Sequence, residues 1–366
     1  MKLSIQRDDL LKPLQQIIGA VEKRQTMPAL SNVLVQCESQ HLSLTATDLE
    51  IELVSKINLM SDETGETTLP AKKLLDICKA LSDDAELNIT IDKDRAVVKS
   101  GRSRFTLATL PANDFPSLDE LTPLVSISMT QTQFKTVIEK TAFAMAQQDV
   151  RYYLNGLLFD LTESGIHSVA TDGHRLSYSN QPMSLNISEN KQIIIPRKGI
   201  MELSRLLQHN DETVQVEIAN NHIRVKVDNI TFTSKLIDGR FPDYNRVIPE
   251  RGDNLLTIDR NEFKQALIRT SILSNEKYRG IRLLLSDSLI KLQSHNPDHE
   301  EANVELDGDY VGDEIEIGFN VNYMLDVLNV SNADQVIISL QDSNSSCLVQ
   351  FPDDENSKYV IMPMRL

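Results

Sequence analysis

The stretch V-A-T-D-G-H-R-L-S-Y-S, residues 169–179, decides how the rest of the sequence is interpreted. Residues 45–55 read T-A-T-D-L-E-I-E-L-V-S, so Ala-Thr-Asp recurs without the glycine, histidine and arginine that follow it in the later stretch. The similarity extends in both directions. S-N-V-L-V-Q (31–36) matches L-N-G-L-L-F (154–159), L-P-A-K-K-L-L-D (69–76) matches I-P-R-K-G-I-M-E (195–202), and N-D-F-P-S-L (113–118) matches G-R-F-P-D-Y (239–244). A register held over this length, at an offset of about 126 residues, indicates a repeated unit.

A fainter third copy follows in the same order, with R-G-I-R-L-L-L (279–285), L-Q-S-H-N-P-D (292–298) and G-F-N-V-N-Y-M-L-D-V-L (318–328), and K-Y-V-I-M-P-M-R-L (358–366) is its last strand. The period is far longer than that of a solenoid, so each copy should be a domain with its own core. We place the domains at residues 1–122, 123–249 and 250–366.

Each copy is expected to contain a helix, a loop, several alternating strands, a second helix and more strands. Two sets of apolar or small residues at helical spacing mark the first helices: Leu10, Leu11, Leu14, Ile17, Ile18 and Val21 in copy one, and Phe134, Val137, Ile138, Thr141 and Met145 in copy two. Alternating segments such as L-N-I-T-I-D (87–92) predict strands. Strands grouped between two helices favour α+β domains over a parallel nucleotide-binding sheet.

Composition narrows the class of protein. The chain has 366 residues, 40% of them hydrophobic, and no apolar run of membrane-spanning length, and its N-terminus becomes charged too early for a signal peptide, so we expect a cytoplasmic protein. Three scattered cysteines, Cys37, Cys78 and Cys347, suggest buried reduced thiols. The net charge of −16 argues against simple electrostatic capture of nucleic acid, although the excess acid is concentrated in residues 250–366.

Cations nevertheless recur at equivalent places in the repeat. The loop after each first helix carries them, at Lys23 and Arg24, at Arg151, and at Lys277 with Arg279. On the second helices Lys72 and Lys79 are seven residues apart, as are Lys198 and Arg205, so each pair shares one helical face. Taken singly these residues could be ordinary solvated cations. Their repetition favours a positive surface that faces a polyanion without reading its sequence.

The two ends of the chain carry complementary charge. Residues 95–107 include Arg95, Lys99, Arg102 and Arg104, whereas residues 298–307 include the adjacent Glu300 and Glu301. This pattern favours head-to-tail association into a ring or a filament. Phe105 and Leu107 at one end, and Ile272 and Leu273 at the other, are candidate apolar contacts, and an ordinary core role for them fits the spacing equally well.

Enzymatic alternatives have weak support. Asp172, His174 and Ser177 could belong to a hydrolase, but closeness in sequence does not establish a nucleophile, base and oxyanion site. The pair His295 and His299 is separated by Pro297, which argues against a helical metal site. Neither common nucleotide-binding glycine motif occurs. We therefore expect no catalytic residue, cofactor or metal, and regard a hydrolase and a monomeric nucleic-acid-binding repeat protein as the alternatives.

Five segments carry a resemblance to a known family: Q-D-V-R-Y-Y-L-N-G (148–156), A-T-D-G-H-R-L (170–176), P-R-K-G (196–199), D-G-R-F-P-D-Y (238–244) and V-I-M-P-M-R-L (360–366). Together with the threefold repeat, they closely resemble the bacterial DNA polymerase III beta subunits, the sliding clamps, over the whole chain. The resemblance implies that two crescent subunits close head to tail into a ring of six similar domains, with helices lining the hole and antiparallel sheets outside.

The resemblance also implies two sets of site residues. Positions that touch DNA are Arg24, Lys72, Gln148, Tyr152 and Tyr153, to which helical spacing adds Lys198 and Arg205. The pocket that takes short peptides from polymerases, the clamp loader and repair proteins is implied at Leu154, Thr171, Gly173, His174, Arg175, Leu176, Pro242, Arg246, Val247, Val360, Met362, Pro363, Met364 and Arg365. Two departures are mild, since relatives often have arginine at Lys72 and valine at Ile361. On this interpretation Asp172 orders a turn, and residues 173–176 form a wall of the peptide groove.

Overall fold

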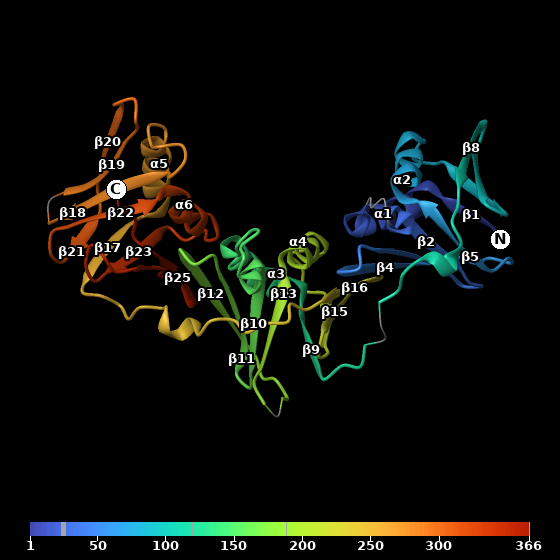
Figure 1. The fold of residues 1–366 in the computed structure, drawn as a ribbon, viewed down its shortest axis with the longest axis horizontal. Helices are drawn as coiled ribbons and strands as arrows, with labels where there is room; N and C mark the ends of the chain where they lie inside the picture. The colour runs from blue at the N-terminus through green and yellow to red at the C-terminus, as the bar shows by residue number, and fades with distance from the viewer. Residues whose placement is uncertain (23–26, 119–120, 188, 288, 366) are drawn as a thin grey trace. The chain divides into compact units, whose positions relative to one another are not determined.

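The computed structural model describes residues 1–22, 27–118, 121–187, 189–287 and 289–365 (Figure 1). The chain divides into two compact units, one formed by residues 1–134 with 201–236 and the other by 135–200 with 237–366. All strand pairing in these ranges is antiparallel, and α-helices pack against the sheets, as expected for the α+β domains that the sequence predicts. The six α-helices of the described ranges are α1 Arg7–Ile17, α2 Ala71–Ala80, α3 Gln131–Glu139, α4 Arg197–Leu206, α5 Arg260–Ser271 and α6 Val321–Asn329.

Two sheets build the first unit. One has the order β1 Lys2–Gln6, β6 Glu86–Asp92, β7 Arg95–Ser100 and β8 Ser103–Ala108. The other has the order β5 Gly65–Pro70, β2 Asn32–Cys37, β3 His41–Thr47, β4 Ile51–Asn58, β16 Ile230–Lys235, β15 His222–Val227, β14 Thr213–Ile218 and β9 Val125–Thr130.

Two further sheets build the second unit. The larger has the order β13 Lys191–Pro196, β10 Gly156–Thr162, β11 Gly165–Thr171, β12 Arg175–Pro182, β25 Asp354–Ile361, β24 Cys347–Phe351, β23 Gln335–Leu340, β17 Asn254–Asp259 and β21 Asp309–Val311. The smaller has the order β20 Glu301–Leu306, β19 Leu289–His295, β18 Gly280–Ser286 and β22 Ile315–Asn320.

Neighbouring copies are joined by one repeated strand pairing. In the first unit β4 of copy one pairs with β16 of copy two, and Leu53 lies opposite Phe232. In the second unit β12 of copy two pairs with β25 of copy three, and Ser177 lies opposite Tyr359. Figure 1 shows the green strand β12 beside the red strand β25. The large sheets therefore run across the sequence repeats, and the compact units do not coincide with them.

The two joints have the same register. Phe232 and Tyr359 are equivalent because each lies opposite a valine of the preceding strand, Val225 and Val349. Leu53 and Ser177 are equivalent because each comes one residue after the partner of Thr47 or Thr171, the threonines of the repeated Ala-Thr-Asp. By the same correspondence, β8 of copy one is the equivalent of β16 and β25, and β20 of copy three is the equivalent of β4 and β12. Within the described ranges β8 and β20 each lie at the end of their sheet order, with one neighbouring strand.

The helices are amphipathic, as their spacing predicts. Leu10, Leu14 and Ile17 of α1 are buried, while Lys72 and Lys79 lie on the exposed face of α2. Two helix ends differ from the prediction. Helix α1 passes into a short 3₁₀ turn at Ile18–Ala20, and α3 stops at Glu139, with Thr141 and Met145 beyond it.

The Thr141 hydroxyl shows why the apolar spacing overestimates α3. It donates to the carbonyl of Val137 at 2.8 Å and lies 2.7 Å from the Ser168 hydroxyl, so it is buried in polar contacts after the helix. The cysteine prediction is confirmed, since Cys37, Cys78 and Cys347 are buried and free. None of the helices within the described ranges is long and apolar enough to cross a membrane.

Candidate functional site

The repeated Thr-Asp pair forms a turn, as predicted. One carboxylate oxygen of Asp172 accepts the backbone N–H groups of His174 at 2.9 Å and Arg175 at 3.1 Å. In copy one Asp48 accepts the N–H groups of Glu50 and Ile51 in the same way, both at 2.8 Å. This side-chain capping of a turn explains why the aspartate recurs although its neighbours change.

The third residue of this turn has a left-handed backbone. Gly173 has φ +88° and Leu49, its equivalent in copy one, has φ +81°. A Cβ on Gly173 would lie 2.8 Å from an Arg151 guanidinium nitrogen, so glycine here also admits the Arg151 side chain. Thr171 completes the turn, because its hydroxyl donates to the Arg175 carbonyl at 2.6 Å and accepts from the Gly173 N–H at 3.1 Å.

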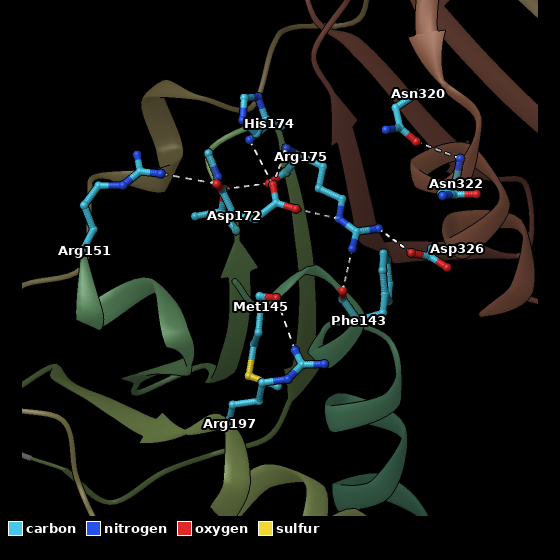
Figure 2. Close-up of polar contacts among 12 residues, drawn as sticks. Phe143, Met145, Arg151, Asp172, His174, Arg175, Arg197, Asn320, Asn322 and Asp326 are labelled. Atoms are coloured by element: carbon cyan, nitrogen blue, oxygen red, sulfur yellow. Dashed lines mark hydrogen bonds and ion pairs between the residues drawn. The ribbon is translucent and has the colours of Figure 1, made fainter. Parts of the chain in front are cut away.

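Arg175 lies in a closed network between this turn and α6 (Figure 2). Its guanidinium pairs with Asp172 at 3.1 Å and Asp326 at 2.5 Å, and donates to the carbonyl of Phe143 at 2.8 Å. It also lies 4.5 Å from the centre of the Tyr323 ring, and the side chain is only 11% exposed. The sequence places Arg175 at the edge of a groove, whereas in the structure its charge is already satisfied by the chain.

The hydrolase alternative does not assemble. The oxygens of Asp172 accept from the turn and from Arg175, while the side chain of His174 is exposed. Ser177 is fully buried, and its hydroxyl donates to the Lys140 carbonyl at 2.6 Å. These three groups therefore do not form the nucleophile, base and orienting acid that such chemistry requires.

Several predicted pocket residues come together in an apolar cluster of the second unit. Leu154, Leu176 and Val360 are 2%, 3% and 1% exposed, and the partly buried Val247 packs against them. They come from different elements, namely the 3₁₀ turn Tyr152–Asn155, β12, β25 and the segment after β16. The pairing of β12 with β25 brings Leu176 directly opposite Val360.

Tyr244 anchors the segment that carries two more of the predicted pocket residues, Pro242 and Arg246. Its hydroxyl donates to Asp160 at 2.9 Å, and burial together with this carboxylate raises the pKa of Tyr244. Pro242 and Arg246, on either side of Tyr244, are exposed, and Arg246 pairs with Asp243 at 3.0 Å. Pro242 and Arg246 are therefore exposed residues of a segment that Tyr244 anchors to Asp160 of β10.

The C-terminal residues line a hollow of about 380 Å³. Met362, Pro363 and Met364 lie there beside His174, and the N–H of Met362 donates to the His174 carbonyl at 2.9 Å. Four further residues line this hollow that the sequence does not predict for the pocket: Lys277, Tyr278, Asn320 and Tyr323. They belong to copy three, and spacing gives no signal for their approach because strand pairing between copies creates it.

A second hollow of about 490 Å³ extends the same surface. Met364 and Tyr278 line both hollows, and Arg365 lines this one with Arg282 and His295. Met364 is held by its N–H, which donates to the Gly318 carbonyl at 2.7 Å. The C-terminal residues 362–365 thus form a wall between the two hollows.

The predicted DNA contacts have different surroundings. Arg24, like Lys23, lies outside the described residues. Gln148, with φ +57°, lines a polar hollow of about 450 Å³ with Arg151 and Arg197. Asp149 orders this loop by pairing with Arg151 at 2.9 Å, and hydrogen bonds from Arg151 lower the pKa of Asp149 to about 2.

The tyrosine pair begins the 3₁₀ turn Tyr152–Asn155. Tyr152 is 57% exposed and its ring meets that of Tyr153 edge to face, with 5.8 Å between ring centres. Tyr153 also packs against the apolar cluster, so it is partly a core residue. Tyr152 is the more available of the two for an external contact.

The two cations of α4 are not equivalent. Lys198 is half-buried, whereas all three guanidinium nitrogens of Arg205 donate within the first unit, to Glu202 and to the carbonyls of Gln15 and Gln16. Arg205 therefore differs from the DNA-facing cation that its spacing predicts, because its guanidinium holds α4 against α1.

The candidate association residues lie on or near the edge strands β8 and β20. Lys99, Arg102, Glu300 and Glu301 are exposed, and Phe105 and Leu273 are half-buried. Ile272 is 72% exposed, but Leu107 is only 7% exposed. Leu107 therefore packs into the chain's own core on the edge strand β8, and its contact with a second copy stays a prediction.

The described part of the chain contains no group of three or more His, Cys, Asp or Glu side chains placed to hold a metal ion. The His295–His299 loop is organised by Asn296, whose side-chain oxygen accepts the N–H groups of Asp298 and Glu300, both at 3.0 Å.

The chain has three copies of one α+β repeat, and antiparallel strand pairing joins the sheets of neighbouring copies. This arrangement defines a DNA-clamp fold. Residues 1–119, 128–243 and 245–365 match, in turn, the N-terminal, central and C-terminal domains of the DNA polymerase III beta subunit. The chain therefore belongs to the DNA polymerase III beta subunit family.

Relatives with known names match the chain over its full length. The chain is 53% identical to a beta sliding clamp of Pseudomonas aeruginosa and 47% identical to that of Escherichia coli K12, covering 100% of each chain. The solved DNA polymerase III subunit beta of P. aeruginosa superposes with a TM-score of 0.97 at 52% identity, covering 100% of both chains. A structure of the P. aeruginosa clamp bound to griselimycin gives a TM-score of 0.96 at 52% identity and the same coverage.

Proposed function

We propose that two copies of this chain close head to tail into a ring around duplex DNA and act as a processivity factor, with domains at 1–122, 123–249 and 250–366. The observation that carries the proposal is the repeated joint. β4 pairs with β16 and β12 pairs with β25 in one register, and within the described ranges the equivalent strands β8 and β20 each lack a partner from another copy. An unpaired edge is a ready template for another chain, and head-to-tail contacts close into rings.

The same correspondence gives the register of the proposed seam. Phe105 is equivalent to Phe232 and Tyr359, because each is opposite Val98, Val225 or Val349. Ala302 is equivalent to Leu53 and Ser177, since Glu301 before it is opposite His295, as Leu176 is opposite Thr171. Phe105 should therefore lie opposite Ala302 of the second copy, and Arg104 opposite Asn303. Arg104 then lies between Glu301 and Glu305 on the neighbouring edge, which supports the charge complementarity of the two ends.

The DNA contacts of such a ring should be weak and independent of sequence. Base-specific contacts would hinder sliding, whereas cation–phosphate contacts exchange readily. Lys72, Gln148, Tyr152, Tyr153 and Lys198 are the proposed contacts of the described residues, with Arg24 added from the sequence. We assign Arg205 to the helix contact described above.

The peptide site is proposed at the surface formed by the apolar cluster and the C-terminal tail. Leu154, Leu176, Val247 and Val360 supply an apolar base, and His174 with Met362, Pro363 and Met364 lines the adjoining hollow. Thr171, Gly173 and Arg175 shape the turn, and Pro242, Arg246 and Arg365 flank the site. Flexible methionines suit several partners, in keeping with short motifs from polymerases, the clamp loader and repair proteins in the bacterial cytoplasm. The griselimycin-bound P. aeruginosa relative supports a ligand-accepting clamp surface.

Sedimentation tests the assembly directly. The ring predicts a particle of twice the chain mass of 41.2 kDa, stable on dilution to nanomolar concentration. A single-chain mass, together with steeply salt-dependent binding to short linear duplexes, would instead support the monomeric repeat protein.

A further inference from the structure

A helix contact accompanies strand pairing where copy one meets copy two. Arg205 of α4 donates to the carbonyls of Gln15 at 3.0 Å and Gln16 at 2.6 Å, and Glu202 accepts from the same guanidinium at 2.7 Å. These carbonyls belong to the last turn of α1, where backbone oxygens lack helical partners and favour a cation. Gly19 lies against Glu202, since a Cβ there would be 2.0 Å from its carboxylate. The joint thus has a helix layer in addition to its sheet layer.

An arginine also ties the second joint at equivalent positions. Phe143 comes as many residues after the start of α3 as Gly19 does after the start of α1, and Asp326 holds the place in α6 that Glu202 holds in α4. Arg175 connects these two positions, donating to the Phe143 carbonyl at 2.8 Å and pairing with Asp326 at 2.5 Å. In both joints, therefore, an arginine bridges an acidic residue of one helix and a carbonyl at or just beyond the end of another.

The same correspondence identifies the groups left over for a third joint. Asp76 and Lys79 of α2 hold the places of Glu202 and Arg205, and both are exposed. At the other end, Ile268 and Arg269 of α5 hold the places of Gln15 and Gln16, and Ile272 that of Gly19. Ile272 is 72% exposed and Ile268 39%, and they lie four residues apart at the end of α5, so together they offer an apolar surface that another chain could cover.

We infer that the seam between two copies has a helix layer in which Lys79 of one copy contacts the carbonyls of Ile268 and Arg269 at the end of α5 in the other, with Asp76 beside it and Ile272 covered. The inference rests on the proposed ring, and adds α2 as a contact surface that edge-strand pairing does not require. The Lys79 ammonium is a point charge, whereas the planar Arg205 guanidinium reaches two carbonyls and a carboxylate together. At the seam a lysine holds the place of Arg205, so this contact should make fewer hydrogen bonds than the one between α1 and α4 and should part more readily.

Subunit exchange between rings labelled with donor and acceptor dyes tests this inference. Lys79→Met keeps the apolar stem and should speed exchange about tenfold, because a hydrogen-bonded cation at the seam is lost. Lys79→Arg restores the fork found at Arg205 and should slow exchange several-fold. Lys12→Met, on the exposed face of α1, is the matched control and should exchange at the wild-type rate.

The outcomes separate this inference from the proposed function. A wild-type chain that sediments as a single copy overturns the ring and the helix layer together. A stable wild-type ring in which both Lys79 variants exchange like Lys12→Met leaves the ring intact and overturns the helix layer. Thermal unfolding of each variant at the wild-type temperature establishes that exchange reports on the seam and not on folding.

Discussion

A disulfide across the proposed seam tests its register residue by residue. In the joints within the chain, Phe232 lies opposite Leu53 and Tyr359 lies opposite Ser177, which places Arg104 opposite Asn303 of a second copy. Both side chains are exposed, so Arg104→Cys with Asn303→Cys in one chain leaves the core unchanged. Opposed residues of an antiparallel pair have Cα atoms about 4.5–5.5 Å apart, within the roughly 4.4–6.8 Å that a disulfide spans.

The matched control moves one cysteine by two residues on the same face. Arg104→Cys with Glu305→Cys displaces the partner by about 6.8 Å along the strand, which makes a Cα separation of roughly 8–9 Å, too long for a disulfide. The native thiols should not interfere, because all three are buried and burial raises the pKa of Cys78 to about 11 and that of Cys347 to about 12.

Mild oxidation followed by denaturing, non-reducing electrophoresis is the assay. The 104–303 variant should form a dimer closed by two disulfides, since a head-to-tail pair has two identical seams, and reduction should return it to single chains. Equal or better cross-linking of the 104–305 variant, or no cross-linking of either by a chain that sediments as a dimer, would refute the register taken from the internal joints.

Four further predictions concern the sites. Arg175→Met should lower the free energy of unfolding by about 2–3 kcal/mol in urea titration, because it leaves Asp172 and the partly exposed Asp326 without the arginine that pairs with both; Arg151→Met, at an exposed pair, should have a much smaller effect, and equal losses would contradict this. Tyr244→Phe should weaken binding of a polymerase-derived peptide about fivefold in calorimetry by freeing the wall that Asp160 anchors, with an unchanged dimer mass; unchanged affinity would show that the anchor has no effect on the pocket. His174→Ala should reduce peptide binding yet leave retention on circular DNA intact, whereas loss of a measured hydrolytic turnover would favour an enzyme. The Asp149 pKa lies near 2 when folded and at 3.8 as a free side chain, so its pairing with Arg151 stabilises the folded loop above pH about 4 and is lost as pH falls through 2; a carboxyl NMR titration with a midpoint near 4 would contradict this.

Much of the fold can be predicted from the Ala-Thr-Asp segment that occurs at both Asp48 and Asp172. Asp48 and Asp172 each cap the same turn, which requires only local hydrogen bonds, so the repeated Thr-Asp predicts the turn and the equivalence of copies one and two. Alternating and helical spacings then predict α+β units. Helix ends are less certain because they depend on buried polar contacts, as with Thr141 beyond α3.

The sites are less predictable because strand pairing between copies assembles them. Tyr278, Asn320 and Tyr323 join His174 around one hollow only after β12 meets β25, and no spacing in the sequence encodes that approach. Spacing also cannot distinguish a cation that faces solvent from one that is bonded to other groups of the chain. Arg205 and Arg175 are of the second kind, so they differ from their expected roles. Leu107 shows the same ambiguity for apolar residues, since alternation fits both a core strand and a covered edge.

Release from DNA of defined topology tests encirclement most directly. The protein is loaded onto nicked circular DNA, separated from free protein, and followed before and after a single restriction cut. A ring that holds DNA by topology should stay on the circle in high salt and leave within minutes once the circle is linear. Retention on linear DNA with free ends, or loss from the intact circle as salt rises, would contradict the ring.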